Sequence, residues 1–386
     1  MTPAMTPPRR VTLAGAATRA LAQSAARLGW QVTAVDAFGD VDLRAVARVI
    51  VAPRDPSGRF GAMAAARLAR GIGGPVVYTS NFDNHPAAVA RLGDVWGNPP
   101  EVLIRARNPV RLMRALARAG FAVPATRLSS PPAADRRTWL VKPRRSGGGV
   151  GIRPWHRGEP VGSGAYVQER IDGIPASVLF VADGRRARPI GLSRQLVGLR
   201  AFGADGFRYA GSVLCRPGDA PWSDEGIVER AVALADAVTR SFGLIGVNGI
   251  DVMIRDGVPY PIEVNPRWCA SMELIERATA LNLFEAHVAA CRGSTEAWSA
   301  RDEVKGIGVW AKAVLYARRA LRAPDLARLM DQGLIADVPH PGEVIGRGQP
   351  ICTVFARGAS PERAIAMLER RAARVYHLLE ASKGAA

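Results

Sequence analysis

Two carboxylates and an amide near the middle of the chain form the group of residues with the clearest chemical potential. Residues 248–267 read NGIDVMIRDGVPYPIEVNPR, a pattern that predicts two strands joined by a turn at Asp256-Gly257. Glu263 and Asn265 are two positions apart, so on a strand their side chains share one face. Asp251 lies on the first strand and can come round to join them if the strands pair about that turn. This set of oxygen ligands suits Mg²⁺ or Mn²⁺ and leaves room for phosphates.

An arginine follows this set directly, although the hairpin also has a simpler interpretation. Arg267 carries a fixed cationic fork that can grip phosphate or a developing negative charge. An ordinary hairpin explains the same letters if Val252 and Val264 face a core while Glu263 faces water. Taken alone, the hairpin favours that simpler interpretation. A second group of residues, earlier in the chain, changes the balance.

A lysine on a short predicted strand precedes a run of glycines. Residues 139–143 read WLVKP and carry Lys142, and residues 144–151 read RRSGGGVG. Backbone N–H groups in a glycine run can approach phosphate oxygens closely, and the segment can close as a flap. A flexible hairpin turn is the alternative. No Gly-Lys-Ser/Thr opens a helix here, so the segment is not a Walker A loop.

Another predicted strand ends at residues 166–173, which read YVQERIDG. A chain that leaves a strand at this point can offer backbone N–H and C=O groups to the edge of an adenine. Together, the two segments supply the candidate nucleotide contacts: Lys142, Ser146, Gly147, Gly148, Gly149, Gln168, Glu169, Arg170, Ile171 and Asp172.

The elements that must position these residues begin with alternating strands and helices. The pattern predicts strands at 11–14, 31–35, 49–51 and 76–78 and helices at 20–28 and 60–70, a small doubly wound domain. Its first turn has the single glycine Gly15 where a dinucleotide site has GxGxxG, which disfavours NAD. Asn81 and Asp83 follow the strand at 76–78, at the edge where parallel sheets meet ligands. A polar loop that caps the next helix explains them equally well.

The rest of the chain alternates less regularly. The pattern predicts antiparallel strands at 178–181 and 189–192, a helix at 225–241, and a helix at 271–280 that begins at Ser271. We expect Glu273 and Glu276 of that helix to face solvent. The predicted tail has strands at 308–316 and 348–355 and a helix at 361–379.

Charge and composition narrow the classes of partner. The net charge is +18, from 52 basic and 34 acidic residues, but only four of the basic residues are lysine. The arginines are scattered and form no stripe interleaved with aromatics, so nucleic acid is not favoured as a partner. No run of eighteen apolar residues occurs, which argues against a membrane span. The histidines show no metal-ligand spacing, so a zinc site is not expected.

Cysteine usage and the N-terminus indicate a cytoplasmic protein. The four cysteines, Cys215, Cys269, Cys291 and Cys352, are far apart and form no CxxC pair, so we expect free thiols in a reducing compartment. Arg9-Arg10 could begin a twin-arginine signal, but further arginines interrupt the apolar region that follows.

In this order, the βαβ opening, the lysine with its glycine flap, the QERI segment and the IEVNPR motif resemble the ATP-grasp superfamily over roughly residues 10–300. The spacing of 12 and 2 from Asp251 to Glu263 to Asn265 is similar to the biotin carboxylase-like branch. The tail segment GQPICTVFARG resembles the C-terminal hairpin domain of that branch. The whole chain is most similar to poorly characterised ATP-grasp proteins, some of them linked to one-carbon metabolism.

The resemblance implies a mixed α/β and α+β fold. It comprises an N-terminal doubly wound pre-ATP-grasp domain at 1–100, a two-lobed ATP-grasp domain at 101–300 and a small C-terminal β-hairpin and helix domain at 301–386. The flap lobe would span about 124–165 and the metal lobe about 166–300.

The resemblance also implies roles for the candidate residues. Lys142 would hold the α-phosphate, the glycines would cover the β- and γ-phosphates, and residues 168–171 would be the adenine hinge. Asp251, Glu263 and Asn265 would hold one or two Mg²⁺, and Arg267 would stabilise the transferred phosphoryl group or the later tetrahedral intermediate. Lys142 and Arg267 are thus the candidate catalytic residues. The candidate substrate contacts are Asn81, Asp83, Arg194, Arg267, Ser271 and Glu273.

Two positions depart from the family pattern. The family usually has a lysine where this chain has Pro109, which leaves Arg105, Arg107 or Arg111 to substitute. Many members place an acid that holds the ribose where this chain has Pro175, and Asp172 could serve instead.

The activity that follows is ATP- and Mg²⁺-dependent ligation of a small-molecule carboxylate to an amine through an acyl phosphate, forming ADP and phosphate. A homodimer is common among such proteins. One alternative is a carboxylase-type component that activates bicarbonate, with its biotin carrier on a separate chain, since no Met-Lys-Met motif occurs. Another is a non-catalytic nucleotide- or nucleic-acid-binding protein on the same fold.

Overall fold

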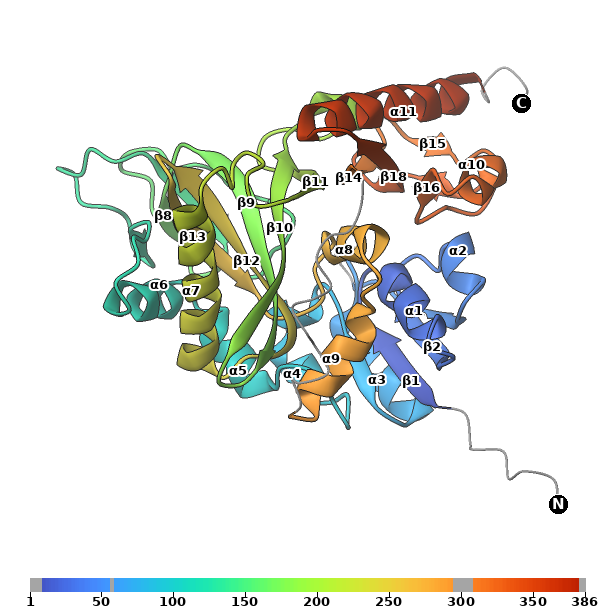
Figure 1. Ribbon diagram of the computed structural model, residues 1–386, viewed down its shortest axis with the longest axis horizontal. Helices are drawn as coiled ribbons and strands as arrows, with labels where there is room; N and C mark the ends of the chain where they lie inside the picture. The colour runs from blue at the N-terminus through green and yellow to red at the C-terminus, as the bar shows by residue number, and fades with distance from the viewer. Residues whose placement is uncertain (1–8, 56–58, 294–307, 382–386) are drawn as a thin grey trace.

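The structure, a computed structural model, describes residues 9–55, 59–293 and 308–381. In Figure 1 the N-terminal and C-terminal elements lie next to each other, and the middle of the chain forms the other half of the molecule. None of the helices in the described ranges combines the length and the apolar character that a membrane span needs. All four cysteines fall in these ranges and are free thiols.

The N-terminal region is a parallel sheet in the order β3-β2-β1-β4, as predicted from the alternating pattern. Its strands are β1 (Arg10–Ala14), β2 (Gln31–Asp36), β3 (Arg48–Val51) and β4 (Val76–Tyr78). Its helices are α1 (Arg19–Ala26), α2 (Val41–Arg44), α3 (Ala62–Ile72) and α4 (Pro86–Val89), with a short 3₁₀ turn η1 (Phe82–Asn84). The loop that carries Asn81 and Asp83 therefore leaves the carboxyl end of β4.

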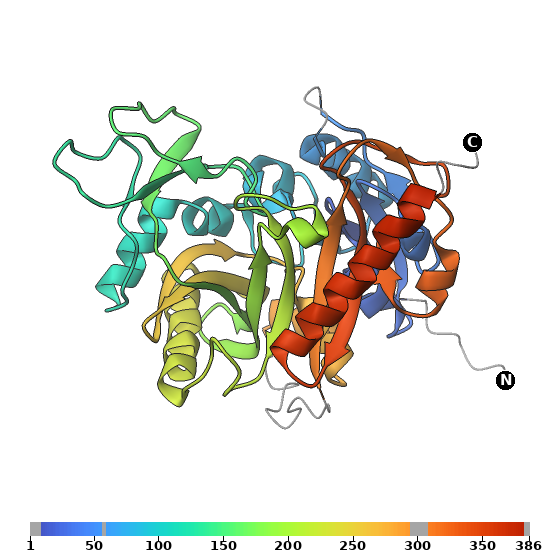
Figure 2. The ribbon, with the colours of Figure 1, turned by 90° about the horizontal axis from the view of Figure 1, so that it is seen from above.

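Two helices and a small antiparallel sheet follow. The helices are α5 (Pro100–Ala106) and α6 (Pro109–Arg118). The sheet has the order β5-β8-β6-β7, with β5 (Thr126–Arg127), β6 (Trp139–Pro143), β7 (Arg153–Pro154) and β8 (Ala165–Glu169). The glycine run lies between β6 and β7, and β6 pairs with β8 so that Lys142 stands opposite Tyr166. Its loops extend from one side of the molecule in Figure 2.

An eight-stranded antiparallel sheet in the order β13-β12-β9-β10-β11-β14-β18-β16 forms the centre. Its strands are β9 (Ile174–Asp183), β10 (Ala187–Val197), β11 (Tyr209–Cys215), β12 (Ile245–Arg255), β13 (Val258–Asn265), β14 (Val309–Tyr316), β16 (Ile335–Ala336) and β18 (Pro350–Gly358). The sheet continues through β11 and β14, on either side of residue 300, so the division of the chain there stays a prediction. A separate pair, β15 (Leu321–Arg322) and β17 (Val344–Ile345), lies in the tail.

The antiparallel strands are longer than the sequence predicted. Strand β10 spans eleven residues rather than the four expected at 189–192, and β11 was not expected at all. Pro189 and Gly191 explain the shortfall, because both residue types weaken a strand signal, and the register with β9 shifts between them.

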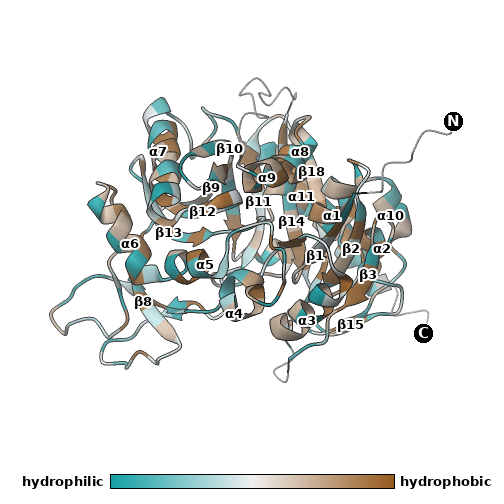
Figure 3. Cartoon of the chain, turned by 90° about the horizontal axis from the view of Figure 1, so that it is seen from below, coloured by the Kyte–Doolittle hydropathy of each residue, from teal (hydrophilic) through white to brown (hydrophobic). Residues whose placement is uncertain are grey.

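Helices cover the central sheet and close its core. Helix α7 (Glu225–Phe242) begins at Asp224, whose side chain accepts from the Ile227 N–H at 2.9 Å, and ends at Gly243 with φ +72°. Helices α8 (Met272–Ala278), α9 (Leu283–Cys291) and α10 (Ala327–Asp331) are shorter. Figure 3 shows hydrophobic residues concentrated on the strands and on the helix faces that meet them.

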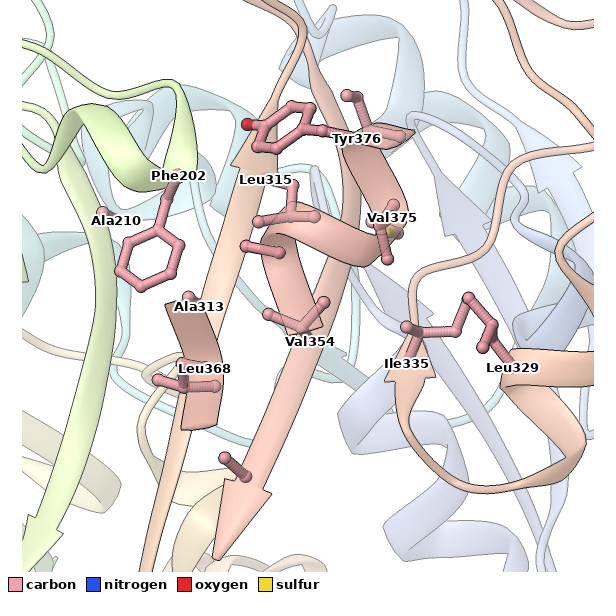
Figure 4. Close-up of a cluster of buried hydrophobic side chains, with 14 of the residues drawn as sticks. Phe202, Ala210, Ala313, Leu315, Leu329, Ile335, Val354, Leu368, Val375 and Tyr376 are labelled. Carbon is pink, nitrogen blue, oxygen red and sulfur yellow. The ribbon is translucent and has the colours of Figure 1, made fainter. Parts of the chain in front are cut away.

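The closing helix α11 (Pro361–Ala381) packs on β14 and β18. In Figure 4, Leu368 and Val375 of this helix lie in one buried cluster with Leu315 of β14 and Val354 of β18. The turn η2 (Arg200–Phe202) inserts Phe202 into the same cluster. The tail is thereby fixed against the central sheet.

Candidate active site

A cavity of about 600 Å³ lies between the small sheet, the central sheet and the N-terminal loops. This volume is in the usual range for small-molecule sites. Most of the residues singled out from the sequence line it: Lys142, Ser146, Gly147, Gly148, Gly149, Gln168, Glu169, Arg170, Ile171, Asp172, Asp251, Glu263, Asn265, Arg267 and Ser271.

The hairpin of β12 and β13 turns where the sequence predicted. Asp256 and Gly257 both have positive φ, +50° and +71°, which a type I′ turn requires and which glycine adopts without strain. Arg255 and Val258 are paired on either side of it. The turn therefore fixes the register from which the two strands run back toward the cavity.

A β-bulge brings the acids together. Counting back from the turn in regular register would place Asp251 opposite Ile262 and would turn Glu263 to the other face. Instead, Val252 pairs with Pro261, the register shifts, and Asp251 pairs with Glu263. The one extra residue on β13 therefore moves Glu263 and its neighbour Asn265 to the face of Asp251.

Hydrogen bonds hold the Asp251 carboxylate from three sides. Ser177 Oγ and Gln195 Nε2 donate to Oδ1 at 2.6 and 2.8 Å, and Asn265 Nδ2 donates to Oδ2 at 2.9 Å. Burial and the nearby Glu263 nevertheless raise the pKa of Asp251 to about 6. Burial and the facing carboxylate thus both disfavour the charged form of Asp251.

Arg267 and Arg107 stand on the other side of this pair. Arg267 Nη2 donates to Asn265 Oδ1 at 2.9 Å, and Arg107 Nη1 lies 3.3 Å from Glu263 Oε2. Both guanidinium groups also flank Asp83, at 3.1 and 3.7 Å. Burial alone would raise the pKa of Asp83, but Arg267 and Arg107 hold it below its ordinary value.

The donors at this point fit a divalent cation. Asp251, Glu263 and Asn265 each offer an oxygen ligand, and a cation between the two acids would offset the burial and the repulsion that raise the pKa of Asp251. Asn265 directs its NH₂ at Asp251, so coordination by all three requires its amide oxygen to leave Arg267. Elsewhere in the described ranges, no group of three or more His, Cys, Asp or Glu side chains could hold a metal.

Lys142 lies at the other end of the cavity, buried in β6. Its Nζ donates to Gln168 Oε1 at 3.0 Å, which ties the lysine strand to the QERI segment. At that segment the Glu169 N–H donates to the carbonyl of Ala125 at 2.8 Å, so it is not free for an adenine. The Ile171 N–H donates to no acceptor in the part of the chain that the structure describes. Of these two N–H groups in the predicted hinge, that of Ile171 is the open one.

The glycine run closes against a loop of the central sheet. Gly149 has φ +75°, and a Cβ there would come within 1.8 Å of the Phe207 carbonyl oxygen, so only glycine fits. The Tyr209 N–H donates to the Gly148 carbonyl at 2.9 Å. The segment behaves as a cover over the cavity that is anchored at its tip.

Comparison with known protein families identifies one that matches the part of the chain around this site. Residues 106–271 match the model of the ATP-grasp domain. The chain contains an ATP-grasp domain. The resemblance inferred from Lys142, the glycine run and the IEVNPR motif is thus confirmed at the level of the domain.

The individual relatives that the comparisons found are distant. An uncharacterized protein of Methanocaldococcus jannaschii is 32% identical over 126 residues, 33% of this chain and 30% of the relative. Pyruvate carboxylase of Rhizobium etli superimposes with a TM-score of 0.71 at 14% identity, covering 95% of this chain and 37% of the other. An L-amino acid ligase of Bacillus licheniformis gives a TM-score of 0.68 at 14% identity, with 95% and 97% covered. At such identities, the structures share the fold.

Beyond the ATP-grasp domain's own residues, a second charged cluster lines the cavity from the N-terminal and C-terminal regions. Arg19 of α1 and Lys312 of β14 both bind Glu273, Lys312 at 2.7 Å, and Arg19 also binds Asp337 at 2.9 Å. Burial alone would raise the pKa of Glu273, but Arg19 and Lys312 hold it far below its ordinary value. Arg19, Lys312 and Asp337 line the cavity, whereas Glu273 lies behind them.

The expectation that Glu273 and Glu276 face solvent is wrong. Glu273 is 5% exposed, and Glu276 accepts hydrogen bonds from Ser24 of helix α1 and from Arg27, the C-cap residue of that helix. Both acids join α8 to α1, which the chain's order alone could not reveal. Ser271 occupies the N-cap position of α8 as predicted, but its side chain makes no capping hydrogen bond.

The other predicted substrate residues divide into two groups. Arg267 and Ser271 line the cavity, whereas Asn81, Asp83 and Arg194 do not. Asp83 is 1% exposed behind Arg267. Arg194 alternates on β10 with Gln195, and Gln195 faces the cavity. Sequence reasoning missed Gln195 and Ser177, for which an isolated polar residue on a strand gives no signal.

Proposed function

We propose that this protein is an ATP- and Mg²⁺-dependent ligase that activates a small-molecule carboxylate as an acyl phosphate and joins it to an amine, releasing ADP and phosphate. One observation carries the proposal. A single cavity joins a buried lysine and glycine cover to the Asp251, Glu263 and Asn265 set, and then continues to a third, separately charged end. Nucleotide, metal and acceptor substrate would thus each have a place along one cavity.

The nucleotide would lie between the small sheet and the central sheet. Lys142 supplies a buried positive charge for a phosphate oxygen, and Ile171 supplies an open backbone donor for the adenine. The exposed Gly147 and Gly148 would present backbone N–H groups to the β- and γ-phosphates. Asp172 is exposed and paired with Arg170 at 2.9 Å, and would have to leave that pair to bind a ribose.

Asp251, Glu263 and Asn265 would hold Mg²⁺. When bound, the cation offsets the negative charge that develops on the phosphoryl group during transfer. Arg267 lies beside these residues and aims a fixed positive charge at the same part of the cavity, while its contacts with Asn265 and Asp83 keep its side chain in place.

The chemistry takes place in two balanced steps. An oxygen of the substrate carboxylate attacks the γ-phosphorus of ATP, and the bond from that phosphorus to the bridging oxygen breaks to release ADP. The amine nitrogen then attacks the acyl carbon, phosphate leaves with the electrons of the carbon–oxygen bond, and the nitrogen gives up a proton. The glycine cover keeps water from the acyl phosphate in the meantime.

The third end of the cavity would receive the acceptor substrate. Arg19 and Lys312 contribute positive charge there and Asp337 contributes negative charge. The Asp337 side chain is 29% exposed, more than those of Arg19 and Lys312. A small polar substrate with ionic groups of both signs suits such a surface better than an apolar one.

The test is phosphate release from ATP and Mg²⁺ with a panel of amino acids, pterin-type acids and bicarbonate. Wild type is compared with Glu263→Gln and with Glu229→Gln, a matched change on the exposed face of α7. Release that depends on one acid–amine pair, persists in Glu229→Gln and is lost in Glu263→Gln supports the ligase. A protein whose melting temperature does not respond to ATP contradicts the proposal.

A bicarbonate-activating carboxylase component is the second candidate. It is favoured by the fold-level likeness to pyruvate carboxylase, which covers 95% of this chain. In the same panel, phosphate release that needs bicarbonate but no amine would select this alternative.

A further inference from the structure

Arg107 occupies a position that the nucleotide and metal residues leave unexplained. It is the C-cap residue of α5, just before α6, and its side chain is 12% exposed. It does not line the cavity, so it is not placed to touch a phosphate. Its guanidinium group nevertheless contacts the back of the candidate metal site of Asp251, Glu263 and Asn265, called the metal set below.

Four acceptors from three regions converge on this one side chain. Nη1 donates to Glu263 Oε2 at 3.3 Å and to the Val264 carbonyl at 3.1 Å. Nη2 donates to Asn84 Oδ1 at 2.8 Å and to the carbonyl of Ser146 at 3.1 Å. Ser146 begins the glycine cover, and Asn84 belongs to the loop after β4. Arg107 therefore joins strand β13, the glycine cover and the N-terminal region.

A buried aspartate extends the connection to the second arginine. Asp83 lies 3.7 Å from Arg107 and 3.1 Å from Arg267, and Arg267 in turn holds Asn265. Glu263 of β13 thus contacts Arg107, and Asn265 of the same strand contacts Arg267. Asp83 lies between the two arginines. Because Asp83 is 1% exposed, this spacing is shielded from water.

We propose that Arg107 is a positioning residue that couples the metal set to the glycine cover. The inference rests on the proposed function. By holding Glu263 through Nη1 and the Ser146 carbonyl through Nη2, one rigid planar group fixes both the oxygen that would face Mg²⁺ and the base of the cover. Loss of the group removes both contacts at once.

The neighbouring arginines provide matched controls. Arg105 is exposed and donates to the Phe242 carbonyl at 3.0 Å, away from the cavity. Arg111 is exposed on α6. Of the three arginines that could stand in for the lysine replaced by Pro109, only Arg107 reaches the site, and it does so from behind Glu263. Arg105→Ala is therefore expected to behave as wild type.

The first experiment separates positioning from direct phosphate contact. Binding of a non-hydrolysable ATP analogue is measured by calorimetry without Mg²⁺ and across a Mg²⁺ series, for wild type, Arg107→Ala, Arg107→Lys and Arg105→Ala. We expect Arg107→Ala to need about tenfold more Mg²⁺ for half-saturation, the usual cost of losing a group that orients a ligand. Its metal-free affinity for the analogue should stay within about twofold of wild type. Arg107→Lys keeps the charge beside Glu263 and should show a smaller increase.

The second experiment tests the connection to the cover. Trypsin cleavage after Arg144 and Arg145, at the base of the cover, is followed by mass spectrometry. Asn84→Ala removes one donor to the Ser146 carbonyl, at 3.2 Å, and leaves Arg107 on Glu263. We expect faster cleavage in both Arg107→Ala and Asn84→Ala, with a raised Mg²⁺ requirement only in Arg107→Ala. Melting curves confirm that each variant is folded.

Two results would overturn the inference. Equal loss of analogue affinity with and without Mg²⁺ would make Arg107 a direct phosphate ligand. An unchanged Mg²⁺ requirement together with unchanged cleavage would leave it no role at the site. If wild type itself binds no analogue, the proposed function fails, whereas the cleavage comparison still tests the contact between Arg107 and the cover.

Discussion

Two clusters of charge line the same cavity, and they are built in opposite ways. At Asp251 and Glu263, two acids face each other, and burial with mutual repulsion raises the pKa of Asp251 to about 6. At Glu273, a single acid meets Arg19 and Lys312, and its pKa is held far below the ordinary value against the effect of burial. In the first cluster Arg107 pairs with Glu263 and Asp251 has no ion pair, whereas in the second the acid has two cationic partners.

This difference separates an acid suited to a cation from an acid that is already paired. A bound cation stabilises the ionised form of an acid that is costly to ionise in the free protein. The Asp251 cluster is therefore suited to binding a cation. An acid that is already paired has nothing more to gain, so the Glu273 cluster stabilises the junction of α1, α8 and β14. The same substitution, Glu to Gln, should therefore lower turnover at Glu263 and lower stability at Glu273.

The largest expected effect is on turnover. Glu263→Gln removes a negative oxygen from the metal set and should lower Mg²⁺-dependent phosphate release by at least about a hundredfold. Its free energy of unfolding should change by less than about 1 kcal/mol, because the lost contact with Arg107 is offset by relief of Asp251. Steady-state kinetics and urea unfolding measure the two. Retained turnover would show that the acids serve some other purpose.

The next effect is on stability. Glu273→Gln leaves Arg19 and Lys312 buried without their shared partner and should lower the free energy of unfolding by about 3 kcal/mol. Binding of Mg²⁺ and ATP should persist below the lowered melting temperature, since no metal-set residue has changed. Urea unfolding beside calorimetry tests this. If the variant were as stable as wild type, the cluster would not hold the regions together.

A smaller effect is expected from the side chains that orient Asp251. Gln195→Leu removes the donor at 2.8 Å from Asp251 Oδ1 and should weaken Mg²⁺ binding by about tenfold. Exchanging Arg194, which alternates with Gln195 on the same strand and does not line the cavity, for alanine provides the control, and it should leave Mg²⁺ binding unchanged. Calorimetric titration with Mg²⁺ in the presence of the ATP analogue compares them. Equal affinity in both variants would place Gln195 outside the site.

The smallest effect concerns pH. The lowered pKa of Glu273 contributes stability that is fully present above the ordinary value of 4.5 and is lost as the pH falls below it. Wild type should therefore lose stability between about pH 5 and pH 3 more steeply than Glu273→Gln. Unfolding midpoints across that range provide the comparison. Parallel curves would mean that the Glu273 pairing does not differ between folded and unfolded protein.

Much of the site could be predicted because its signals are local. Lys142, the glycine run and the turn at Asp256-Gly257 are defined by residues adjacent in sequence, and their positions agree with the structure. The gathering of Asp251 with Glu263 could be proposed from the pattern, but its cause could not be seen. It depends on the bulge at Ile262, one extra residue that no periodicity signals.

What could not be predicted depends on contacts between distant parts of the chain. Glu273 looked like a solvated helix residue because its partners, Arg19 and Lys312, lie far away in the sequence. Arg107 was one of three equivalent arginines until the fold brought it behind Glu263. Long-range charge pairing is set by tertiary packing, which local pattern does not record.

The most direct test of the account is the melting temperature of wild type, Glu263→Gln and Glu273→Gln with the ATP analogue, with and without Mg²⁺. The account predicts that Mg²⁺ raises the melting temperature of wild type and, from a lower starting point, that of Glu273→Gln by a similar increment. In Glu263→Gln the Mg²⁺ increment should disappear. An increment that survives in Glu263→Gln and vanishes in Glu273→Gln would reverse the roles of the two clusters and contradict the account.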